Sequence, residues 1–417
     1  MGRNMSNSSR GMAMLMVVTI IAILATMAMD FSYEAMVNLQ LTATYRDEVR
    51  AYFLAHSALN ISRLVLFYQK QLDSILKGNN IAQMFGGSIQ LWRLIPIDSE
   101  FTKSFASGEL FNALGFSEIK GENPALEEVH KKEGGGEGGE RPFAGKFGDF
   151  DGYFKASIED EESKISLRNF DATPSLRNFA MTQLMLLMLP QQYNPIFENR
   201  DMDNQYTTRE ELIGALKDYQ DMDDKQFDFL TQQDIGPPED IFYSSLEKPY
   251  QAKNAPFDSL EEIRMVRGVG DLFFYNFADR LTIYPVKKFN IASLDDRMIL
   301  SIICMFIRDK NHPVCTDPTF TSQMDLLKRF EEFKQLKQAQ NPLFVPTVAD
   351  IKEFCSLEGL VLQEAILGVG KMEDLLTSES SFFRIEAIGV VGSVKKRITA
   401  VVYADKSRSE LLYYRED

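Results

Sequence analysis

The start of the chain is dominated by a long apolar run. It extends from Met12 to Met29 and is interrupted only by Thr19 and Thr26. A helix of this length measures about 27 Å, close to the ~30 Å thickness of the hydrocarbon core of a membrane. The pattern therefore predicts a membrane-spanning helix over residues 12–29.

Charged residues flank this run asymmetrically. A short polar leader, residues 1–11, contains Arg3 and Arg10 and ends at Gly11, whereas Asp30 follows the apolar run. Basic residues tend to stay on the cytoplasmic side of a membrane span. We therefore expect a single-pass membrane protein whose N-terminus stays in the cytoplasm and whose body lies on the other side of the membrane.

The residues alone leave three interpretations of the apolar run open. A secretory signal would need a shorter apolar core and a small-x-small cleavage site, which Ala25–Ala28 supplies only poorly. An uncleaved signal anchor is the ordinary alternative. Cleavage between Gly11 and Met12 would instead make the apolar run the mature N-terminus.

A helix is expected to continue well beyond the membrane segment. No glycine or proline occurs from Met12 to Lys77, and both residue types break helices. Over residues 30–77 apolar residues recur near helical spacing, with charged residues between them. They are Tyr45, Val49, Tyr52, Phe53, Leu59, Leu64 and Phe67. The helix is expected to end between residues 57 and 67 in a shorter version, and near Lys77 in a longer one.

Strand patterns appear in the middle and at the end of the chain. Period-2 alternation predicts strands over residues 152–158, 382–390, 393–403 and 411–414, the last three forming an antiparallel meander. A further strand is expected over residues 89–95, around Trp92.

These patterns divide the chain after its first helix. Residues 78–164 hold the first strands and a Gly-rich segment, 121–149, that is expected to be a disordered loop. Residues 165–285 and 286–376 are expected to be two mainly helical segments, and residues 377–417 the C-terminal strands.

Composition and charge narrow the function. Of 417 residues, 45% are hydrophobic and 25% are charged, which is typical of a globular protein. The net charge of −15 disfavours nucleic acid as a main partner and favours divalent cations or basic protein surfaces. With three histidines and three cysteines, the chain has few residues that could support His-based catalysis or a zinc site. No common catalytic motif occurs in the sequence. We therefore expect neither an enzyme nor a small-molecule substrate.

One acidic cluster is a candidate metal site. Asp218, Asp221, Asp223 and Asp224 lie within seven positions, and Glu239 and Asp240 follow a turn at residues 236–238. Ca²⁺ binds six to eight oxygen ligands, and this cluster could supply four or five of them. The spacing is not that of an EF-hand, and from the residues alone a solvated acidic loop is the favoured interpretation.

The basic leader ending in glycine, the apolar run and the amphipathic helix together resemble a type IV pilin or pseudopilin. Further motifs resemble the K-type minor pseudopilin of type II secretion systems (the general secretion pathway protein K family) in their order. These are K-I-x-L-x-N at 164–169, D-x-D at 221–223, G-x-x-E-D at 236–240, P-Y at 249–250, N-x-P at 254–256, and the runs 281–285 and 289–292. The chain departs from the family at Tyr219, where tryptophan is usual, at Pro238, where alanine is common, and in lacking a second asparagine after Asn290.

The resemblance implies a fold and a role. The implied fold is α+β, with a pilin-like long N-terminal helix packed on a small antiparallel sheet and a large, mostly α-helical inserted domain whose first part, 165–285, is SAM-like. The implied role is to cap the pseudopilus tip and to initiate its assembly for the export of folded periplasmic proteins. The implied partners are the I-type and J-type minor pseudopilins, the major pseudopilin, and a prepilin peptidase that cleaves between Gly11 and Met12 and methylates the new amine.

Two residue assignments follow from the same resemblance. Family members usually carry a glutamate at the fifth mature position, which is thought to neutralise the amine of a neighbouring subunit; here that position is Met16, which implies a place at the tip. The family also binds calcium in its helical domain. This implies a structural Ca²⁺ with Asp221, Asp223 and Glu239 as direct ligands and Asp218 and Asp240 as further candidates.

Two glycine-containing motifs suggest an alternative function. Val266–Gly270 and Leu367–Gly370 resemble the hairpin of helix-hairpin-helix units, which can present backbone N–H groups to DNA phosphate. The alternative is a membrane-anchored helix-hairpin-helix DNA-binding protein of a DNA-uptake system. The acidic body and the few basic residues nearby, Arg264, Arg267 and Lys371, favour tight turns between packed helices instead.

The cysteines are expected to lie in an oxidising compartment. Cys304 lies in the apolar run 298–307 and is expected to be a buried thiol, whereas Cys315 and Cys355 could pair. The sequence leaves the connectivity open.

Overall fold

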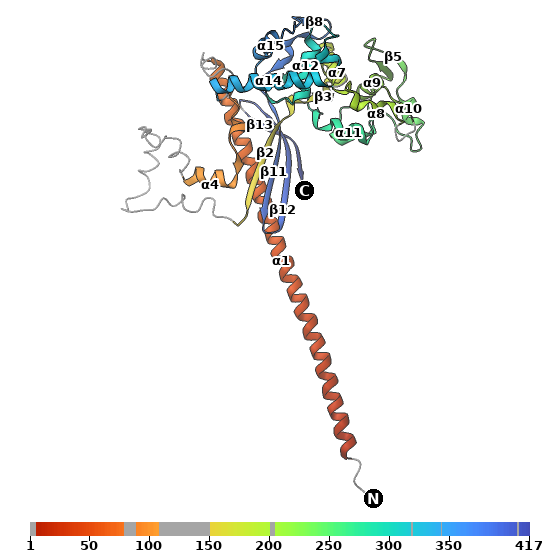
Figure 1. The fold of residues 1–417 in the computed structure, drawn as a ribbon. Helices are drawn as coiled ribbons and strands as arrows, with labels where there is room; N and C mark the ends of the chain where they lie inside the picture. The colour runs from red at the N-terminus through yellow and green to blue at the C-terminus, as the bar shows by residue number, and fades with distance from the viewer. Residues whose placement is uncertain are drawn as a thin grey trace, which may run out of the picture.

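The computed structural model describes residues 6–78, 89–107, 151–200, 205–317, 320–342, 344–406 and 408–417. The expected Gly-rich loop, 121–149, lies outside the described residues. Within the described residues, a long helix, a five-stranded sheet and a helical body follow one another from the N-terminus to the far end of the molecule (Figure 1). The fold is therefore α+β, as expected.

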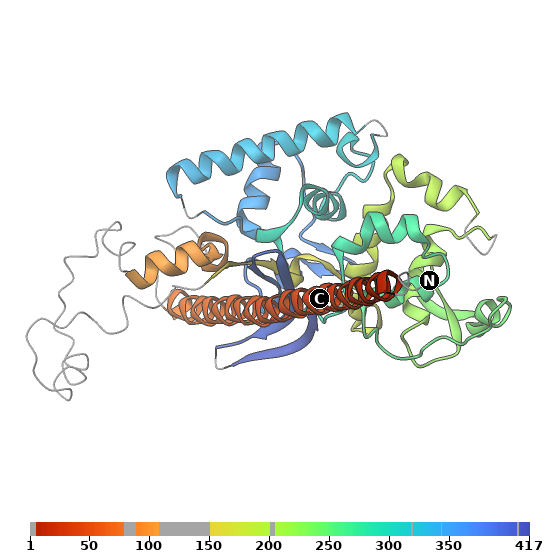
Figure 2. The same cartoon turned by 90° about the horizontal axis from the view of Figure 1, so that it is seen from below.

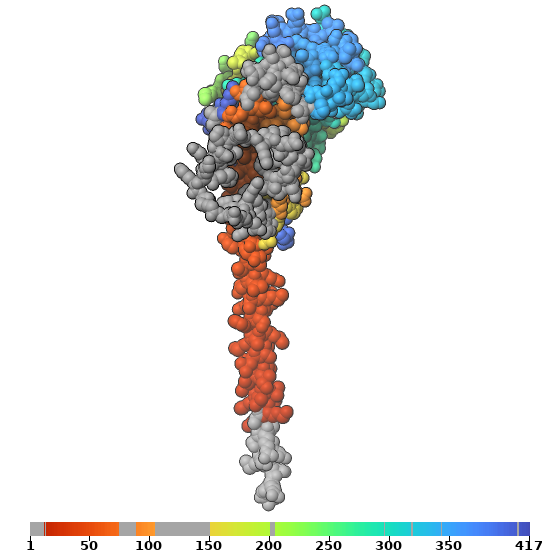
Figure 3. Space-filling model, turned by 90° about the vertical axis from the view of Figure 1, so that its left-hand side faces the viewer, coloured from red at the N-terminus to blue at the C-terminus, as the bar shows by residue number. Residues whose placement is uncertain are grey.

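Helix α1 (Ser6–Gly78) is the longest element, at 73 residues or about 110 Å. Its N-terminal half projects from the body as an isolated rod, and side chains from Met14 to Met36 are exposed (Figure 3). Its length and composition allow this half to cross a membrane. The helix follows the longer of the two predicted versions because its C-terminal half has a surface to bury: a face that starts at Ala51 packs against the sheet.

The sheet has the strand order β1-β2-β11-β12-β13, and every neighbouring pair is antiparallel. The strands are β1 (Ile97–Asp98), β2 (Tyr153–Asp160), β11 (Phe382–Val391), β12 (Val394–Ala404) and β13 (Ser409–Glu416). Burial alternates strictly along β11, as expected for a strand with one face on a core. The predicted C-terminal meander is confirmed.

Small residues allow α1 to lie directly on the sheet. The buried face of the helix includes Ala51, Ala55 and Ala58, and Gly389 of β11 lies beneath the first two. A Cβ atom on Gly389 would lie 2.0 Å from the carbonyl oxygen of Ala51 and 2.6 Å from the amide nitrogen of Ala55. Both neighbours are backbone atoms, so only glycine fits at this position.

A large insertion separates β2 from β11 and forms a hydrophobic core of its own, distinct from the core between α1 and the sheet. Its helices are α7 (Pro174–Met188), α8 (Asn194–Glu198), α9 (Arg209–Asp218), α10 (Asp240–Ser244), α11 (Asp271–Phe277), α12 (Asp296–Phe306), α13 (Pro313–Thr316), α14 (Thr321–Gln340), α15 (Val348–Leu357) and α16 (Met372–Leu375). Viewed from below, these helices spread well beyond the width of α1 (Figure 2).

Short strands complete the insertion. They are β3 (Ile165–Ser166), β4 (Lys225–Asp228), β5 (Gln233–Pro238), β6 (Leu281–Thr282), β7 (Phe289–Asn290), β8 (Ala365–Ile366), β9 (Gly370–Lys371) and β10 (Leu376–Thr377). The pairs β3–β6 and β7–β10 are parallel, whereas β4–β5 and β8–β9 are antiparallel hairpins.

Buried polar residues connect the sheet to the insertion at the 3₁₀ turn that follows β2, Glu161–Ser163. The fully buried carboxylate of Glu161 forms ion pairs with Arg384 of β11 and Lys164. The Glu162 carboxylate accepts a hydrogen bond from the backbone N–H of Ser381, 2.8 Å away, and burial raises its pKa to about 7. The chain therefore enters the insertion beside the point where it returns to the sheet.

The segment around Trp92 differs from the predicted strand. Leu91–Leu94 forms the helical turn α3, whose first backbone N–H donates to the side-chain oxygen of Gln69 on α1 at 2.6 Å. This side-chain bond replaces the strand pairing that the alternation suggested. The Trp92 ring packs edge-on against Phe383, with 5.6 Å between ring centroids.

The cysteine pairing also differs from the sequence expectation. Cys304 in α12 and Cys315 in α13 form a disulfide, with 5.6 Å between their Cα atoms, because a short connection brings α13 back against the end of α12. The prediction that Cys304 is a free thiol is wrong. Cys355 on α15 is instead the buried thiol, and burial raises its pKa to about 12.

We predict that Gly389→Ala destabilises the packing of α1 on the sheet by about 1–3 kcal/mol, since the added methyl group forces two backbones apart. Denaturant unfolding of the full chain in detergent measures the change. Ser157→Ala, at an exposed position of β2, is the control and should leave the unfolding free energy within about 0.5 kcal/mol of wild type. Equal stability of the Gly389→Ala variant and wild type would contradict the close approach.

Candidate metal centre

The acidic cluster lies where α9, the β4–β5 hairpin and α10 meet. A capping box starts α9: the Thr208 side chain accepts from the Glu211 backbone N–H, and the Glu211 carboxylate accepts from that of Thr208. Two glycines let the hairpin fold close to the helix. A Cβ on Gly214 would lie 2.7 Å from the Phe227 carbonyl oxygen, and one on Gly236 would lie 2.5 Å from the Gln226 Cβ.

This packing brings three buried carboxylates together. Asp218 ends α9, Asp221 lies in the turn that follows, and Glu239 lies just after β5. One carboxylate oxygen from each lies within 4.8 Å of the others, and the three residues are 5%, 4% and 5% exposed. We call Asp218, Asp221 and Glu239 the inner group.

A second set of carboxylates adjoins the first. Asp221, Asp223 and Asp234 also bring one oxygen each within 4.8 Å of one another, and Asp221 belongs to both sets. Asp223 is exposed and Asp234, on β5, is half-buried. We call these three residues the outer group.

Several oxygens of the inner group are left without protein donors. Asp218 accepts from the Phe227 backbone N–H at 2.9 Å, and one oxygen of Asp221 accepts from Lys217. Among the described residues, the other Asp221 oxygen and both Glu239 oxygens have no hydrogen-bond partner, although they are buried. Because buried charged groups without partners are costly, the inner group is suited to a cation.

The electrostatics of the inner group support the same conclusion. Burial, reinforced by the neighbouring carboxylates, raises the pKa of Glu239 to about 9. Burial also raises the pKa of Asp218 to about 8 and increases that of Asp221. Burial and mutual repulsion therefore disfavour the ionised form of these carboxyl groups, and a divalent cation bound between them would favour it again. Hard carboxylate oxygens are the ligands that Ca²⁺ and Mg²⁺ prefer.

The structure distributes the predicted ligands unevenly. Asp218, Asp221 and Glu239 lie in the inner group, whereas Asp223 lies in the outer group and accepts from the Lys225 backbone N–H at 2.9 Å. Asp240 lies outside both groups. Its carboxylate accepts from the backbone N–H of Ala252 at 2.9 Å and from the Gln251 side chain at 3.3 Å.

Sequence reasoning did not identify Asp234. It joins the outer group because β4 and β5 pair antiparallel with Phe227 opposite Asp234. The connection between the two strands, Phe229–Gln232, contains no glycine, and Gln232 takes the left-handed conformation with φ of 58°. The residues usual in hairpin turns are therefore missing, and the hairpin that places Asp234 has no clear signature.

The two glycine motifs have different surroundings. Val266–Gly270 precedes α11, and Gly268, with φ of +81°, packs against Thr207. Gly368 lies in the turn between the strands β8 and β9, and its carbonyl oxygen accepts from the Asn178 side chain of α7 at 2.9 Å. The second motif is therefore a β-hairpin docked on α7 and not a turn between two helices, contrary to the expectation for this motif.

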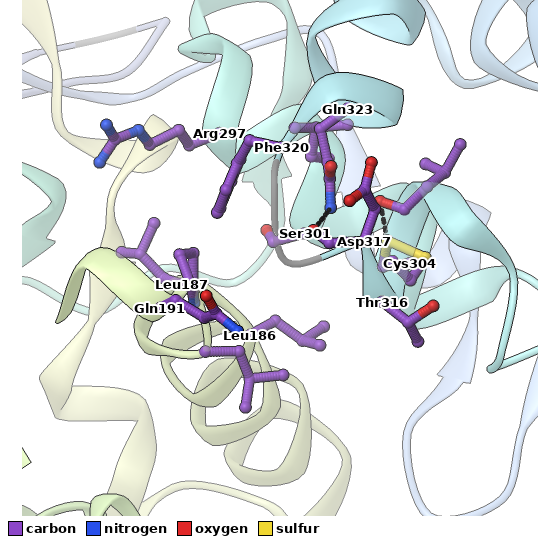
Figure 4. Close-up of a pocket in the computed structure, with 15 residues that line it drawn as sticks. Leu186, Leu187, Gln191, Arg297, Ser301, Cys304, Thr316, Asp317, Phe320 and Gln323 are labelled. Carbon is purple, nitrogen blue, oxygen red and sulfur yellow. Dashed lines mark hydrogen bonds between the residues drawn. A yellow bond between two sulfur atoms is a disulfide. The ribbon is translucent and has the colours of Figure 1, made fainter. Parts of the chain in front are cut away.

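An apolar pocket of about 180 Å³ lies beside the disulfide (Figure 4). Leu186 and Leu187 of α7 form one wall, and Ser301 of α12 lies on another. The Asp317 carboxylate in its lining accepts from the Ser322 backbone N–H and hydroxyl at 3.0 and 2.9 Å. The acidic lining residue is thus already engaged in hydrogen bonds within the protein.

Comparison with known proteins finds a similarity to a solved structure. No protein-family model matches the chain, and no curated protein matches it. Among solved structures, the chain is similar to one in the crystal structure of the GspK–GspI–GspJ complex from the type 2 secretion system of enterotoxigenic Escherichia coli. The sequence identity is 16%, the match covers 64% of this chain and 80% of that chain, and the TM-score is 0.38.

We predict that Ca²⁺ raises the unfolding temperature of the wild-type chain, since saturation to about 100 times the dissociation constant adds about 2.7 kcal/mol of stability. Glu239→Gln should abolish this shift, because it removes a carboxylate whose two oxygens are free to bind the ion. Thermal unfolding in Ca²⁺ and in a chelator measures the shift. Asp240→Asn is the control and should keep it; an unchanged shift in Glu239→Gln would exclude this residue as a ligand.

Proposed function

We propose that this chain is a minor pseudopilin of a type II protein secretion system, which caps the pseudopilus tip and initiates its assembly. The main observation in support of this proposal is the division of α1 into two different halves. One half of this continuous helix is apolar, exposed and of membrane length, and the other half is packed on an antiparallel sheet that supports a broad body (Figures 1 and 3).

The leader fits processing by a prepilin peptidase. Residues 1–11 contain Arg3 and Arg10 and end at Gly11, directly before the apolar run. Cleavage between Gly11 and Met12, followed by methylation of the new amine, leaves the apolar half of α1 as an inner-membrane anchor. The N-terminus then lies on the cytoplasmic side and the body in the periplasm.

Partner helices are expected to pack along α1 beyond the membrane. Leu39, Phe53 and Leu64 are 72%, 62% and 51% exposed. Their spacing is close to whole numbers of helical turns, so they share one face of the helix, and the buried face that begins at Ala51 points elsewhere. An exposed apolar stripe of this kind is suited to the helices of I-type and J-type minor pseudopilins and of the major pseudopilin.

Two features support a terminal place in the filament. Met16 offers an apolar side chain where a carboxylate would be needed to neutralise the amine of a subunit placed above it. The inserted body is also wide: its helices extend well beyond the width of α1 (Figure 2). A subunit of this shape is difficult to stack within a filament and simple to place at its end.

The proposal also includes a structural calcium site, formed by the inner group. Asp218, Asp221 and Glu239 would hold the ion, and the unpartnered oxygens of Asp221 and Glu239 support this assignment. The ion would neutralise the buried carboxylates and stabilise the contact between α9 and the β4–β5 hairpin. No catalytic step is part of the proposed role.

We predict that Gly11→Val blocks removal of the leader, because a branched side chain at the last leader position obstructs the cleavage site. In cells with an active prepilin peptidase, the variant should migrate more slowly than wild type. Mass spectrometry of the wild-type chain should find methylated Met12 at its N-terminus. Gly2→Val is the control and should be processed normally. A wild-type N-terminus beyond Asp30 would instead indicate an ordinary secreted protein.

We also predict that an antibody against the inserted body labels isolated pseudopili at one end only. Cells that lack the chain should form fewer pseudopili, because initiation is lost, whereas the pseudopili that do form should keep their normal width. Immunogold electron microscopy measures both. Label distributed along the filaments would contradict the capping role, and normal numbers of pseudopili without the chain would contradict initiation.

A further inference from the structure

The outer group differs from the inner group in one respect: it already contains a cation. The Nζ atom of Lys217 donates to Asp234 at 2.7 Å and also to Asp221. Lys217 lies in the last turn of α9 and is only 3% exposed. Its ammonium group therefore lies between two of the three outer carboxylates.

The position of this ammonium is fixed from more than one side. In addition to its two carboxylate partners, Nζ lies 4.9 Å from the centroid of the Phe227 ring, a distance at which a cation is attracted to an aromatic face. Phe227 is buried, and its backbone N–H donates to Asp218 of the inner group. The lysine is thus part of the packed structure and not a mobile surface side chain.

The protein offsets the negative charge of the inner group less completely. It contains three carboxylates that are at least as buried as those of the outer group, yet both oxygens of Glu239 and one of Asp221 have no partner among the described residues. Asp221 uses one oxygen for Lys217 and leaves the other free. The two groups therefore offer similar ligands, but Lys217 pairs with two of the three outer carboxylates and with only one of the three inner ones, Asp221.

We propose that the Lys217 ammonium acts as a built-in cation that fills the outer group, so that this centre binds one divalent cation, in the inner group, and not two. The proposal rests on the calcium site proposed above. Lys217 is a positioning residue here: it sets the number of ions by occupying the place of the second one and by holding Asp221 between the two groups.

Elementary electrostatics supports this assignment. A second divalent ion in the outer group would lie beside the buried ammonium group of Lys217. Two positive charges in direct proximity repel each other strongly where water is largely excluded. Lys217 would then have to leave both carboxylates and be desolvated without a partner. Replacement of the lysine by a neutral residue removes that repulsion and leaves Asp221, Asp223 and Asp234 as uncompensated oxygen ligands.

The experiment counts Ca²⁺ ions bound by the full chain in detergent, by calorimetry and by equilibrium dialysis. Wild type should bind one ion per chain and Lys217→Met should bind two. Lys225→Met removes an exposed lysine at the start of β4 and is the matched control, with one ion expected. Adding Asp234→Asn to Lys217→Met should return the number to one, because it removes a ligand of the outer group.

The outcomes separate this inference from the calcium site itself. If wild type binds no ion, the calcium site fails, and this inference fails with it. If wild type binds one ion and folded Lys217→Met also binds one, the calcium site stands and the role of Lys217 is overturned.

A second readout uses wild type alone, in case Lys217→Met does not fold. With saturating Mn²⁺, electron paramagnetic resonance should show a single uncoupled ion per chain. A spin-coupled pair of ions bridged by one carboxylate would show that the outer group accepts a metal in spite of Lys217, which would overturn the inference.

Discussion

The contact between α1 and β11 is the constraint on which the rest of the structure depends. The helix extends far beyond the sheet. Its N-terminal half projects from the body, and the sheet and the insertion are attached to its C-terminal half. At Gly389 the two backbones approach so closely that a single methyl group would not fit. At this point of closest approach, alanines on the helix face a glycine on the strand, and larger side chains fill the core on either side; this arrangement fixes where along the sheet the helix can lie.

A second set of buried contacts fixes the insertion relative to the sheet. The chain leaves the sheet at Glu161 and returns beside Ser381, and the side chains at this crossing are buried and mutually bonded. Glu161 is neutralised by Arg384 and Lys164, whereas the Glu162 carboxyl group is held with its pKa raised to about 7. Because the insertion is attached through two adjacent crossings and not one linker, the orientation of α1 is transmitted to the helical body.

Local patterns were sufficient to predict much of this fold, and long-range packing decided the rest. The C-terminal strands follow from period-2 alternation, and α1 follows from a run without helix breakers. Trp92 lies in a helical turn because a side chain from α1, Gln69, caps it, and the cysteines pair according to how α13 folds back on α12. Neither contact is visible in the residues nearby.

The candidate site shows the same division between local and long-range information. The cluster of acidic residues marks the region, yet membership of each group depends on a hairpin whose turn lacks the usual residues, and this hairpin is what brings in Asp234. The inner group contains residues from both sides of that hairpin, Asp221 before it and Glu239 after it. A cation bound by both would close the intervening loop in the folded state, and its binding energy would become folding energy for this region. The acidic residues that oppose folding when no ion is bound would then stabilise the body that the proposed tip presents.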